Sequence, residues 1–201
     1  YIPTEQTGNK WTNSVLNYTT ACQNSEISDN FILMNDDFFA IKPIRDWEAE
    51  TNKCLGTFSE KLEGLKDKKQ LSRWQNAFVY GAELFKQLGC KTEYNYEAHL
   101  PIIINKAKFL EMLNKPEIKE FMETAKVLHK RSVYKNLYQD PNIIPVKVKD
   151  VKLELQEDLS DERLKDNWLS VYDYMVNNIR VYPKLNKTLN LLFAGKCKYE
   201  V

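Results

Sequence analysis

The nine residues 31–39, FILMNDDFF, constrain the fold of this chain more than any other stretch. The first four are apolar, which predicts a strand buried on both faces. An amide and two carboxylates follow at once, at Asn35, Asp36 and Asp37. Because burying an uncompensated carboxylate is costly, we expect the two acids to lie where the strand leaves the core and to meet a cation, a hydroxyl donor or water.

Two interpretations of Asp36 and Asp37 stay open from these residues alone. Open α/β sheets bind ligands at the carboxyl ends of their strands, and Mg²⁺ or Mn²⁺ takes oxygen ligands that link carboxylates to a diphosphate. This argument favours a metal site. Asn and Asp also favour turns, so an Asx-rich turn after a core strand would need no ligand.

Length and composition set the broad class of protein. With 201 residues, 43% of them hydrophobic and 12% aromatic, the chain can bury a core, and a single domain over residues 1–201 is predicted. The net charge is +1 and Lys and Arg are spread evenly, which argues against a nucleic-acid or membrane-surface partner. No apolar run is long enough to predict a membrane span. Four cysteines without a C-x-x-C pair favour a reducing, cytoplasmic location. Because the chain begins at Tyr1 rather than Met, we expect that residues upstream were removed or are missing.

Apolar periodicity and capping residues predict four helices. They are Trp11–Cys22, Leu71–Leu88 with Gly89 as its C-terminal cap, a helix capped by Asn105 that runs to Leu113, and a helix opened by Pro116 that carries Ile118, Phe121, Met122 and Ala125 on one face.

Three further stretches are less regular. The segment Glu48–Gln70 is rich in charge and predicts a long surface excursion. In Val146–Leu155 an alternating pattern changes phase near Asp150, which predicts a strand with a bulge or a break. The segment Trp168–Leu192 is expected to be helical, with an interruption at Pro183.

Five short segments carry a resemblance to known proteins. In chain order they are Asn35–Phe39, Glu97–Pro101, Arg131–Tyr134, Ser170–Asp173 and Phe193–Glu200. Together they resemble bacterial and bacteriophage glycosyltransferase-like proteins and, more distantly, the Stealth-type sugar-phosphate transferases of capsule synthesis. The Asn-Asp-Asp and His-x-Pro elements are the most specific parts of the resemblance.

The resemblance implies an α/β fold, a Rossmann-like mixed sheet related to glycosyltransferase type A with additional helices. Such proteins place a full nucleotide-binding strand–helix half before the acidic motif. Here few residues precede that motif, so we expect this half to be short, missing, or supplied by a partner chain or an absent N-terminal segment.

The resemblance also implies a nucleotide-sugar donor and Mn²⁺ or Mg²⁺. The paired acids of the family serve the metal and diphosphate, which corresponds to Asp36 and Asp37 here, and we expect a catalytic part for Asp37 as well. Arg131 corresponds to an arginine that meets phosphate, and we expect Asn35 to contact the donor beside it. Lys10, which follows Gly-Asn at the start of a helix, is a further candidate for phosphate.

The histidine of the His-x-Pro element corresponds to His99, which suits a general base that takes a proton from an acceptor hydroxyl, with Glu97 beside it. The alternative is a packed turn residue. We expect His129 on the surface, and for Arg131 a solvated helix end is the alternative. Ser170 and Asp173 fit a relaxed capping box, which needs no ligand.

These observations predict a metal-dependent glycosyltransferase that moves a sugar from a nucleotide sugar to a hydroxyl on a glycan, capsule or phage or cell-surface component. Two rivals remain: transfer of a sugar 1-phosphate, and a non-catalytic accessory subunit of the same fold.

Overall fold

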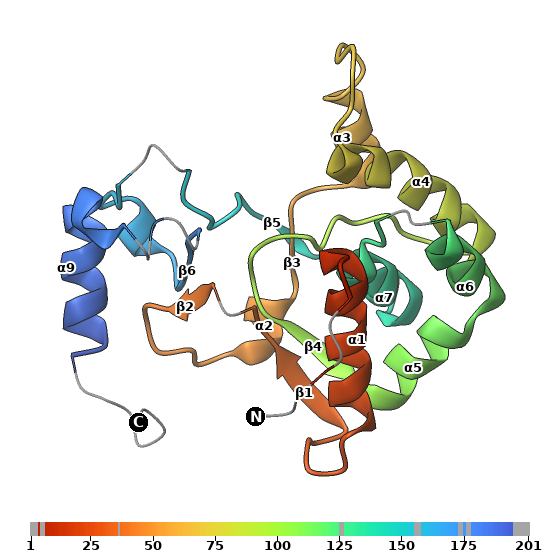
Figure 1. Cartoon of the computed structure of the whole chain (residues 1–201), viewed down its shortest axis with the longest axis horizontal. Helices are drawn as coiled ribbons and strands as arrows, with labels where there is room; N and C mark the ends of the chain where they lie inside the picture. Colours follow the sequence, from red (N-terminus) through yellow and green to blue (C-terminus); the bar gives the residue numbers. More distant parts are fainter. Residues whose placement is uncertain are drawn as a thin grey trace.

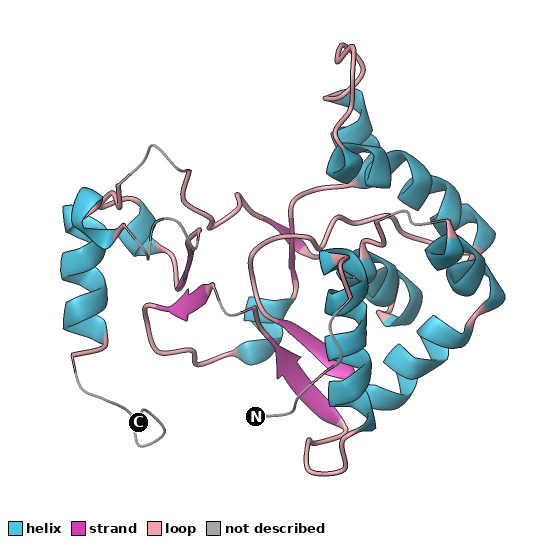
Figure 2. Ribbon diagram, viewed as in Figure 1, coloured by secondary structure: helices cyan, strands magenta, loops and turns pink. Residues whose placement is uncertain are grey.

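The computed structural model describes residues 4, 7–35, 37–124, 127–154, 158–172, 175 and 178–194. It shows a mixed α/β protein (Figures 1 and 2). The helices are α1 (Lys10–Gln23), α2 (Trp47–Thr51), α3 (Phe58–Glu63), α4 (Arg73–Gln87), α5 (Lys106–Asn114), α6 (Pro116–Glu123), α7 (Lys130–Tyr138) and α9 (Pro183–Leu192), with 3₁₀ turns η1 (Arg163–Lys165) and η2 (Ile179–Val181). The strands are β1 (Asn30–Leu33), β2 (Phe38–Ala40), β3 (Lys53–Cys54), β4 (Ile102–Asn105), β5 (Val146–Lys147) and β6 (Trp168–Ser170).

Within the described residues the strands form three two-stranded sheets. β1 pairs with β4 and β2 pairs with β6, both antiparallel, while β3 and β5 are parallel. The prediction of a strand buried on both faces at residues 31–34 is wrong. Phe31 and Leu33 pack on the core, but Ile32, which points to the opposite face of the strand, is 38% exposed, so that face is only partly covered.

The larger lobe packs α1 and α3 to α7 around one core, and the four predicted helices are confirmed there (Figure 1). Local signals define their ends. The Asn9 side chain accepts from Trp11 N at the start of α1, and Asn105 caps α5 by accepting from Lys108 N. Gly89 follows α4 with φ of +66°, a backbone conformation that glycine adopts without strain.

Two predictions about irregular stretches are wrong. The segment 48–70 is no simple surface excursion, since it contains most of α2 and all of β3 and α3, and Phe58 is fully buried with its ring 4.9 Å from Phe78. The segment 168–192 begins as strand β6 and not as helix. The predicted interruption at Pro183 is confirmed: the 3₁₀ turn η2 ends at Val181 and Pro183 opens α9, because proline lacks the N–H that the first helical turn leaves unpaired.

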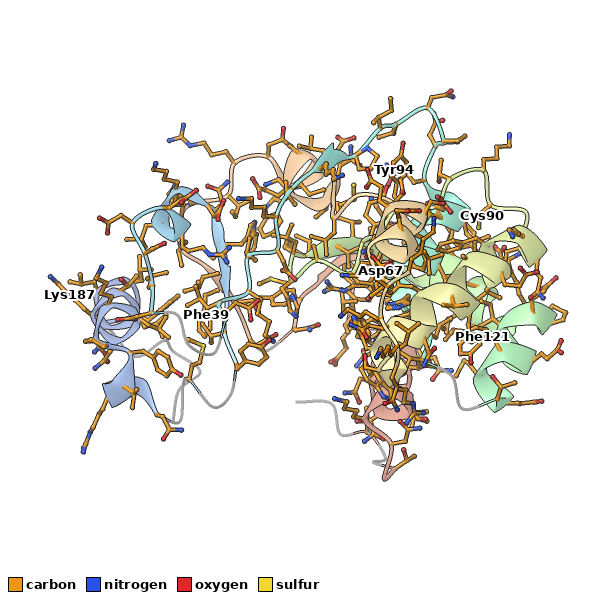
Figure 3. The ribbon with its side chains drawn as sticks, turned by 90° about the horizontal axis from the view of Figure 1, so that it is seen from above. Phe39, Asp67, Cys90, Tyr94, Phe121 and Lys187 are labelled. Carbon is orange, nitrogen blue, oxygen red and sulfur yellow. The ribbon has the colours of Figure 1, made fainter. Side chains whose placement is uncertain are left out.

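The smaller lobe consists of β2, β6 and α9 at the opposite end of the molecule, as the view from above shows with Lys187 of α9 and Phe121 of α6 far apart (Figure 3). It has its own apolar cluster, to which Leu153, Leu169 and Leu185 belong. A third cluster joins β6 to the turn ahead of β4, through Trp168, Leu100, Ala98 and Val151. The candidate site lies beside this third cluster.

None of the described helices is long and apolar enough to cross a membrane. Cys22, Cys54 and Cys90 carry free thiols, and Cys197 lies outside the described residues.

Candidate functional site

Helix α7 fixes the turn that carries His99. Asn136 exchanges hydrogen bonds with the backbone of Tyr94, and Ser132 Oγ accepts from Tyr96 N. Arg131 Nη1 then donates to the carbonyl oxygens of residues 98 and 100, at 2.7 and 2.9 Å, on either side of the histidine. Three side chains of one helix therefore set the course of residues 94–100.

The His99 side chain is paired with Asp150, which follows β5. Asp150 Oδ2 lies 2.8 Å from His99 Nδ1, and Asp150 Oδ1 accepts from the backbone N–H of His99 at 3.1 Å. Burial raises the pKa of Asp150, but the hydrogen bonds and charge of His99 outweigh burial and bring that pKa below its ordinary value. An ionised carboxylate only accepts hydrogen bonds, so Nδ1 is the ring nitrogen that donates to Asp150, and Nε2 is the nitrogen that is left for another partner.

Asp37 stands in the turn between β1 and β2. Its Oδ2 accepts from Lys152 Nζ at 2.9 Å and from Ser170 Oγ at 3.1 Å. Its Oδ1 is buried and has no hydrogen-bond partner among the described residues. A buried carboxylate oxygen without a donor is uncommon and calls for a cation, a water or a ligand.

The two pairs belong to one site. The backbone N–H of Lys152 donates to Asp150 Oδ1 at 3.4 Å. Lys152 therefore contacts Asp37 through its side chain and Asp150, the partner of His99, through its backbone. The ring of Phe38, next to Asp37, meets the His99 ring edge-on with centroids 5.9 Å apart. Asp37 and His99, predicted as site residues from segments far apart in the sequence, are thus brought together.

Arg131 is a buried residue behind the turn, only 5% exposed, and its guanidinium carbon lies 5.2 Å from the centroid of the Phe38 ring. The solvated helix end considered as its alternative is therefore wrong. Nη2 has no hydrogen-bond partner among the described residues, while Nη1 is occupied by the two carbonyls. The arrangement makes Arg131 a support for the His99 turn.

Glu97 faces away from His99, so the expected alignment of these two side chains is wrong. Glu97 Oε1 accepts from Ser132 N and Oγ, and Oε2 lies 3.9 Å from His129 Nδ1. Burial raises the pKa of Glu97, yet His129, Lys130 and Arg131 together bring it to about 2. Burial in turn lowers the pKa of Lys130 to about 8, which Glu97 partly opposes.

His129 is 2% exposed, so its predicted surface position is wrong. Its ring centroid lies 4.2 Å from that of Trp74 and 4.3 Å from that of Phe78, both on α4. Aromatic side chains from a distant helix bury this histidine, which its charged sequence neighbours do not reveal.

The remaining predicted site residues lie elsewhere or are not described. Asn35 is exposed and its carbonyl accepts from Phe38 N at 3.2 Å. Lys10 is the first residue of α1, with its ammonium 4.6 Å from the centroid of the Trp11 ring and no described contact to Asp37 or His99. Asp36 and Asp173 lie outside the described residues, and Ser170 belongs to β6, so the predicted capping box at Ser170 is wrong.

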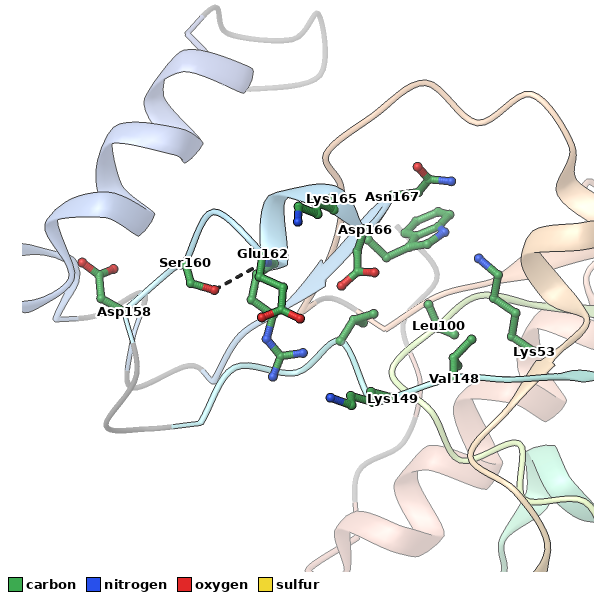
Figure 4. Close-up of a pocket in the computed structure, with 13 residues that line it drawn as sticks. Lys53, Leu100, Val148, Lys149, Asp158, Ser160, Glu162, Lys165, Asp166 and Asn167 are labelled. Atoms are coloured by element: carbon green, nitrogen blue, oxygen red, sulfur yellow. Dashed lines mark hydrogen bonds between the residues drawn. The ribbon is translucent and has the colours of Figure 1, made fainter.

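A cavity of about 810 Å³ lies against the same turns (Figure 4). Leu100 and Val151, which follow His99 and Asp150 in the chain, line it together with Trp168 and a polar rim that includes Lys149 and Lys165. Arg163 also lines it and donates to the carbonyl of residue 150 at 2.8 Å. His99 and Asp37 do not line the cavity.

Among described residues, a set that leaves out Asp36, no three His, Cys, Asp or Glu side chains are grouped closely enough to hold a metal. Sequence reasoning missed Lys152, for which no local signal existed, and assigned Ser170 to a helix cap rather than to Asp37, whose Oδ2 accepts from its hydroxyl. Asp150 was marked by the change of phase in its segment, but its pairing with His99 was not foreseen. Compared with known proteins, the chain matches no family model, no curated protein and no solved structure.

Proposed function

We propose that the protein is a metal-dependent glycosyltransferase that moves a sugar from a nucleotide-sugar donor to a hydroxyl acceptor. One observation carries the proposal. His99 Nδ1 and Asp150 Oδ2 lie 2.8 Å apart, and Lys152 contacts both Asp150 and Asp37, whose Oδ1 has no hydrogen-bond partner among the described residues. Transfer of a sugar from a nucleotide sugar to a hydroxyl needs a general base for the hydroxyl and a cation for the diphosphate. A histidine beside a carboxylate that suits a cation can meet both needs.

Asp37 fits a divalent cation. Its buried, unpartnered Oδ1 is a hard oxygen ligand of the kind that Mg²⁺ and Mn²⁺ take, and Asp36 is the neighbouring carboxylate in the sequence. When bound, the cation supplies charge neutralisation for the departing diphosphate. Mg²⁺ usually binds through one or two carboxylates plus phosphate oxygens, so a group of three protein acids is not required.

The chain's own residues supply the base. With Nδ1 donating to Asp150, Nε2 of His99 accepts the proton of the acceptor hydroxyl, and the nearby Asp150 carboxylate stabilises the imidazolium that results. His99 is partly open to solvent, with 28% of its side chain exposed, so a hydroxyl can reach it. Arg131 holds the turn from behind and keeps the ring in place.

The cavity beside these turns is a candidate position for the part of the acceptor away from its reacting hydroxyl, since His99 itself does not line the cavity. Its volume of about 810 Å³ lies within the usual range for small-molecule sites. The apolar wall of Leu100, Val151 and Trp168 with a polar rim suits a saccharide, which presents both kinds of surface.

The relation to the type A glycosyltransferase fold is part of the same proposal, as are the Stealth-like resemblance and the cytoplasmic location. In support, the turn that carries Asp37 and the turn that carries His99 are adjacent, so that two of the resembling segments contribute to one site. A donor-binding half from a partner chain or an upstream segment would complete such a fold.

Nucleotide release tests the proposal. The protein is incubated with UDP-, GDP-, CDP- and dTDP-sugars, with Mn²⁺ or with EDTA, and with a panel of short oligosaccharides. We expect Mn²⁺-dependent release from one donor class, reduced roughly 10² to 10⁴-fold in His99→Ala, with unfolding unchanged. A donor labelled in its β-phosphate distinguishes transfer of the sugar from transfer of a sugar 1-phosphate.

The control is Lys66→Ala, which replaces a side chain that is 67% exposed in the turn after α3 and should leave release unchanged. Release that is equal in wild type and His99→Ala would overturn the mechanism. No release from any donor would favour the accessory-subunit rival.

A further inference from the structure

Asp37 already has a resident counter-ion. Lys152 Nζ lies 2.9 Å from Asp37 Oδ2, and the two side chains are only 18% and 14% exposed. Ser170 Oγ donates to the same oxygen at 3.1 Å, so both donors gather on Oδ2 and leave Oδ1 without a partner. Oδ2 of Asp37 is thus occupied by two donors, and Oδ1 is open to a ligand.

Lys152 is held by this single acid. Within the described part of the chain, Asp37 is the one carboxylate at ion-pair distance from its ammonium, which also lies 4.2 Å from the centroid of the Tyr172 ring. The positive end of Lys152 is therefore close to the open oxygen of Asp37 as well as to the occupied one.

A divalent cation and an ammonium on one carboxylate repel each other. Two like charges a few ångströms apart repel each other strongly in a partly buried site, and a doubly charged cation increases the repulsion. A diphosphate removes the conflict, because its negative oxygens can meet both the cation and the ammonium. Binding of the two ligands should then be coupled, and equally so in both directions.

We propose that Lys152 is the counter-ion of Asp37 in the ligand-free protein and the diphosphate-binding residue once a divalent cation occupies Asp37, so that cation and diphosphate bind together and poorly alone. The proposal rests on the proposed function, from which the cation and the diphosphate are taken. It assigns donor binding to a residue on the segment after β5, which the sequence did not single out.

The test separates the two ligands by using probes free of sugar and base. Binding of Mn²⁺ alone is followed by the electron paramagnetic resonance signal of free Mn²⁺, and binding of the Mn²⁺–pyrophosphate complex by calorimetry. Lys152→Met should bind Mn²⁺ alone at least about tenfold more tightly than wild type, because the competing charge is gone. The same variant should bind Mn²⁺–pyrophosphate at least about tenfold more weakly.

Two further variants test whether the changes are specific to the charge of Lys152. Lys147→Met removes the same charge five residues away, from the surface of β5, where this lysine pairs with Glu60 and is 62% exposed, and it should behave as wild type in both measurements. Lys152→Gln keeps a hydrogen-bond donor for Asp37 without the charge. It should show the same two changes even if Lys152→Met fails to fold.

The outcomes distinguish this inference from the proposed function. If wild type binds Mn²⁺ and Asp37→Asn does not, but the Lys152 variants bind both probes as wild type does, the role of Lys152 is overturned and the metal site stands. If neither wild type nor the Lys152 variants bind Mn²⁺, with or without pyrophosphate, the metal site itself is overturned.

Discussion

Replacement of Arg131 by methionine should destabilise the protein strongly, because this arginine supports the His99 turn. Methionine keeps an apolar stem but removes the guanidinium that lies over the Phe38 ring, and with it both hydrogen bonds to the carbonyls of residues 98 and 100. Hydrogen bonds from a charged group contribute about 1.5–3 kcal/mol each, and loss of one partner of a buried ionic group costs about 3–5 kcal/mol. With Arg131 only 5% exposed, we expect the free energy of unfolding to fall by about 3–5 kcal/mol.

Urea unfolding, followed by circular dichroism, measures this change. Arg131→Lys keeps the charge but cannot span two carbonyls with a planar group, so its loss should be about half as large. Lys147→Met is the control: this lysine pairs with Glu60 at the surface, 62% exposed, and its removal should cost less than about 1 kcal/mol. If Arg131→Met lost less than about 1 kcal/mol while binding of Mn²⁺–pyrophosphate disappeared, Arg131 would be a ligand-binding residue and the reasoning here would be refuted.

Three further predictions follow from single contacts. The pKa of Glu97 is about 2 in the folded protein, so its contribution to stability is present above the ordinary value near 4.5 and is lost as pH falls toward 2, a change of about 3 kcal/mol that Glu97→Gln should abolish in acid unfolding curves. Gly81→Ala places a Cβ 2.7 Å from Phe58 Cε1, and should lower the free energy of unfolding by about 1–3 kcal/mol despite the better helix propensity of alanine. In Asp150→Asn, His99 should no longer be held in the tautomer with the proton on Nδ1, a change that ¹⁵N spectra of the imidazole detect. Sugar transfer should fall by at least about 10²-fold, with little change in the free energy of unfolding.

Each of these has a result that contradicts it. An acid transition that is the same in wild type and Glu97→Gln would show that the neighbouring cations do not depend on this carboxylate. Gly64→Ala, where the nearest atom to the new Cβ is 3.6 Å away, is the control for Gly81→Ala, and equal stability of the two variants would exclude a clash. An unchanged His99 tautomer in Asp150→Asn would remove Asp150 as its positioning residue.

The sequence predicted α1, α4, α5 and α6 because the signals of these helices are local, whereas the short helices α2 and α3 were not predicted. The Asn105 cap and the Pro116 start lie within a turn of the residues they organise, and both were read correctly. Strand β6 was missed since it is only three residues long and is defined by its pairing with β2, some 130 positions earlier in the chain. No periodicity can appear in so short an element.

The candidate site was predicted in part. His99 and Asp37 were chosen from motifs, and the fold brings them together. Their partners were not chosen, because Asp150 is 51 residues from His99 and Lys152 is 115 residues from Asp37. Such pairs depend on how the two lobes meet. The change of phase in the alternating pattern predicted a strand irregularity near Asp150, and the Asp150 side chain accepts a hydrogen bond from the backbone N–H of His99.

Burial of charged residues was the least predictable feature. His129 and Arg131 stand in a run of basic residues, which is typical of a solvated helix end. His129 is buried because Trp74 and Phe78 of α4 pack against its ring. Arg131 is buried beside Phe38, with Nη1 bound to the carbonyls of residues 98 and 100. Glu97 supplies the opposing charge for both. The local charge pattern cannot show that aromatic side chains and an acid from other parts of the chain contact these basic residues.

Crystals soaked with Mn²⁺ and a panel of nucleotide diphosphates test the central claim most directly, because anomalous scattering locates the manganese. The account predicts a manganese peak within coordination distance of Asp37 Oδ1, roughly 2.0–2.3 Å, with the diphosphate between that ion and Lys152 and with His99 Nε2 on the same side. A nucleotide bound with its diphosphate elsewhere, and no manganese at Asp37, would contradict it.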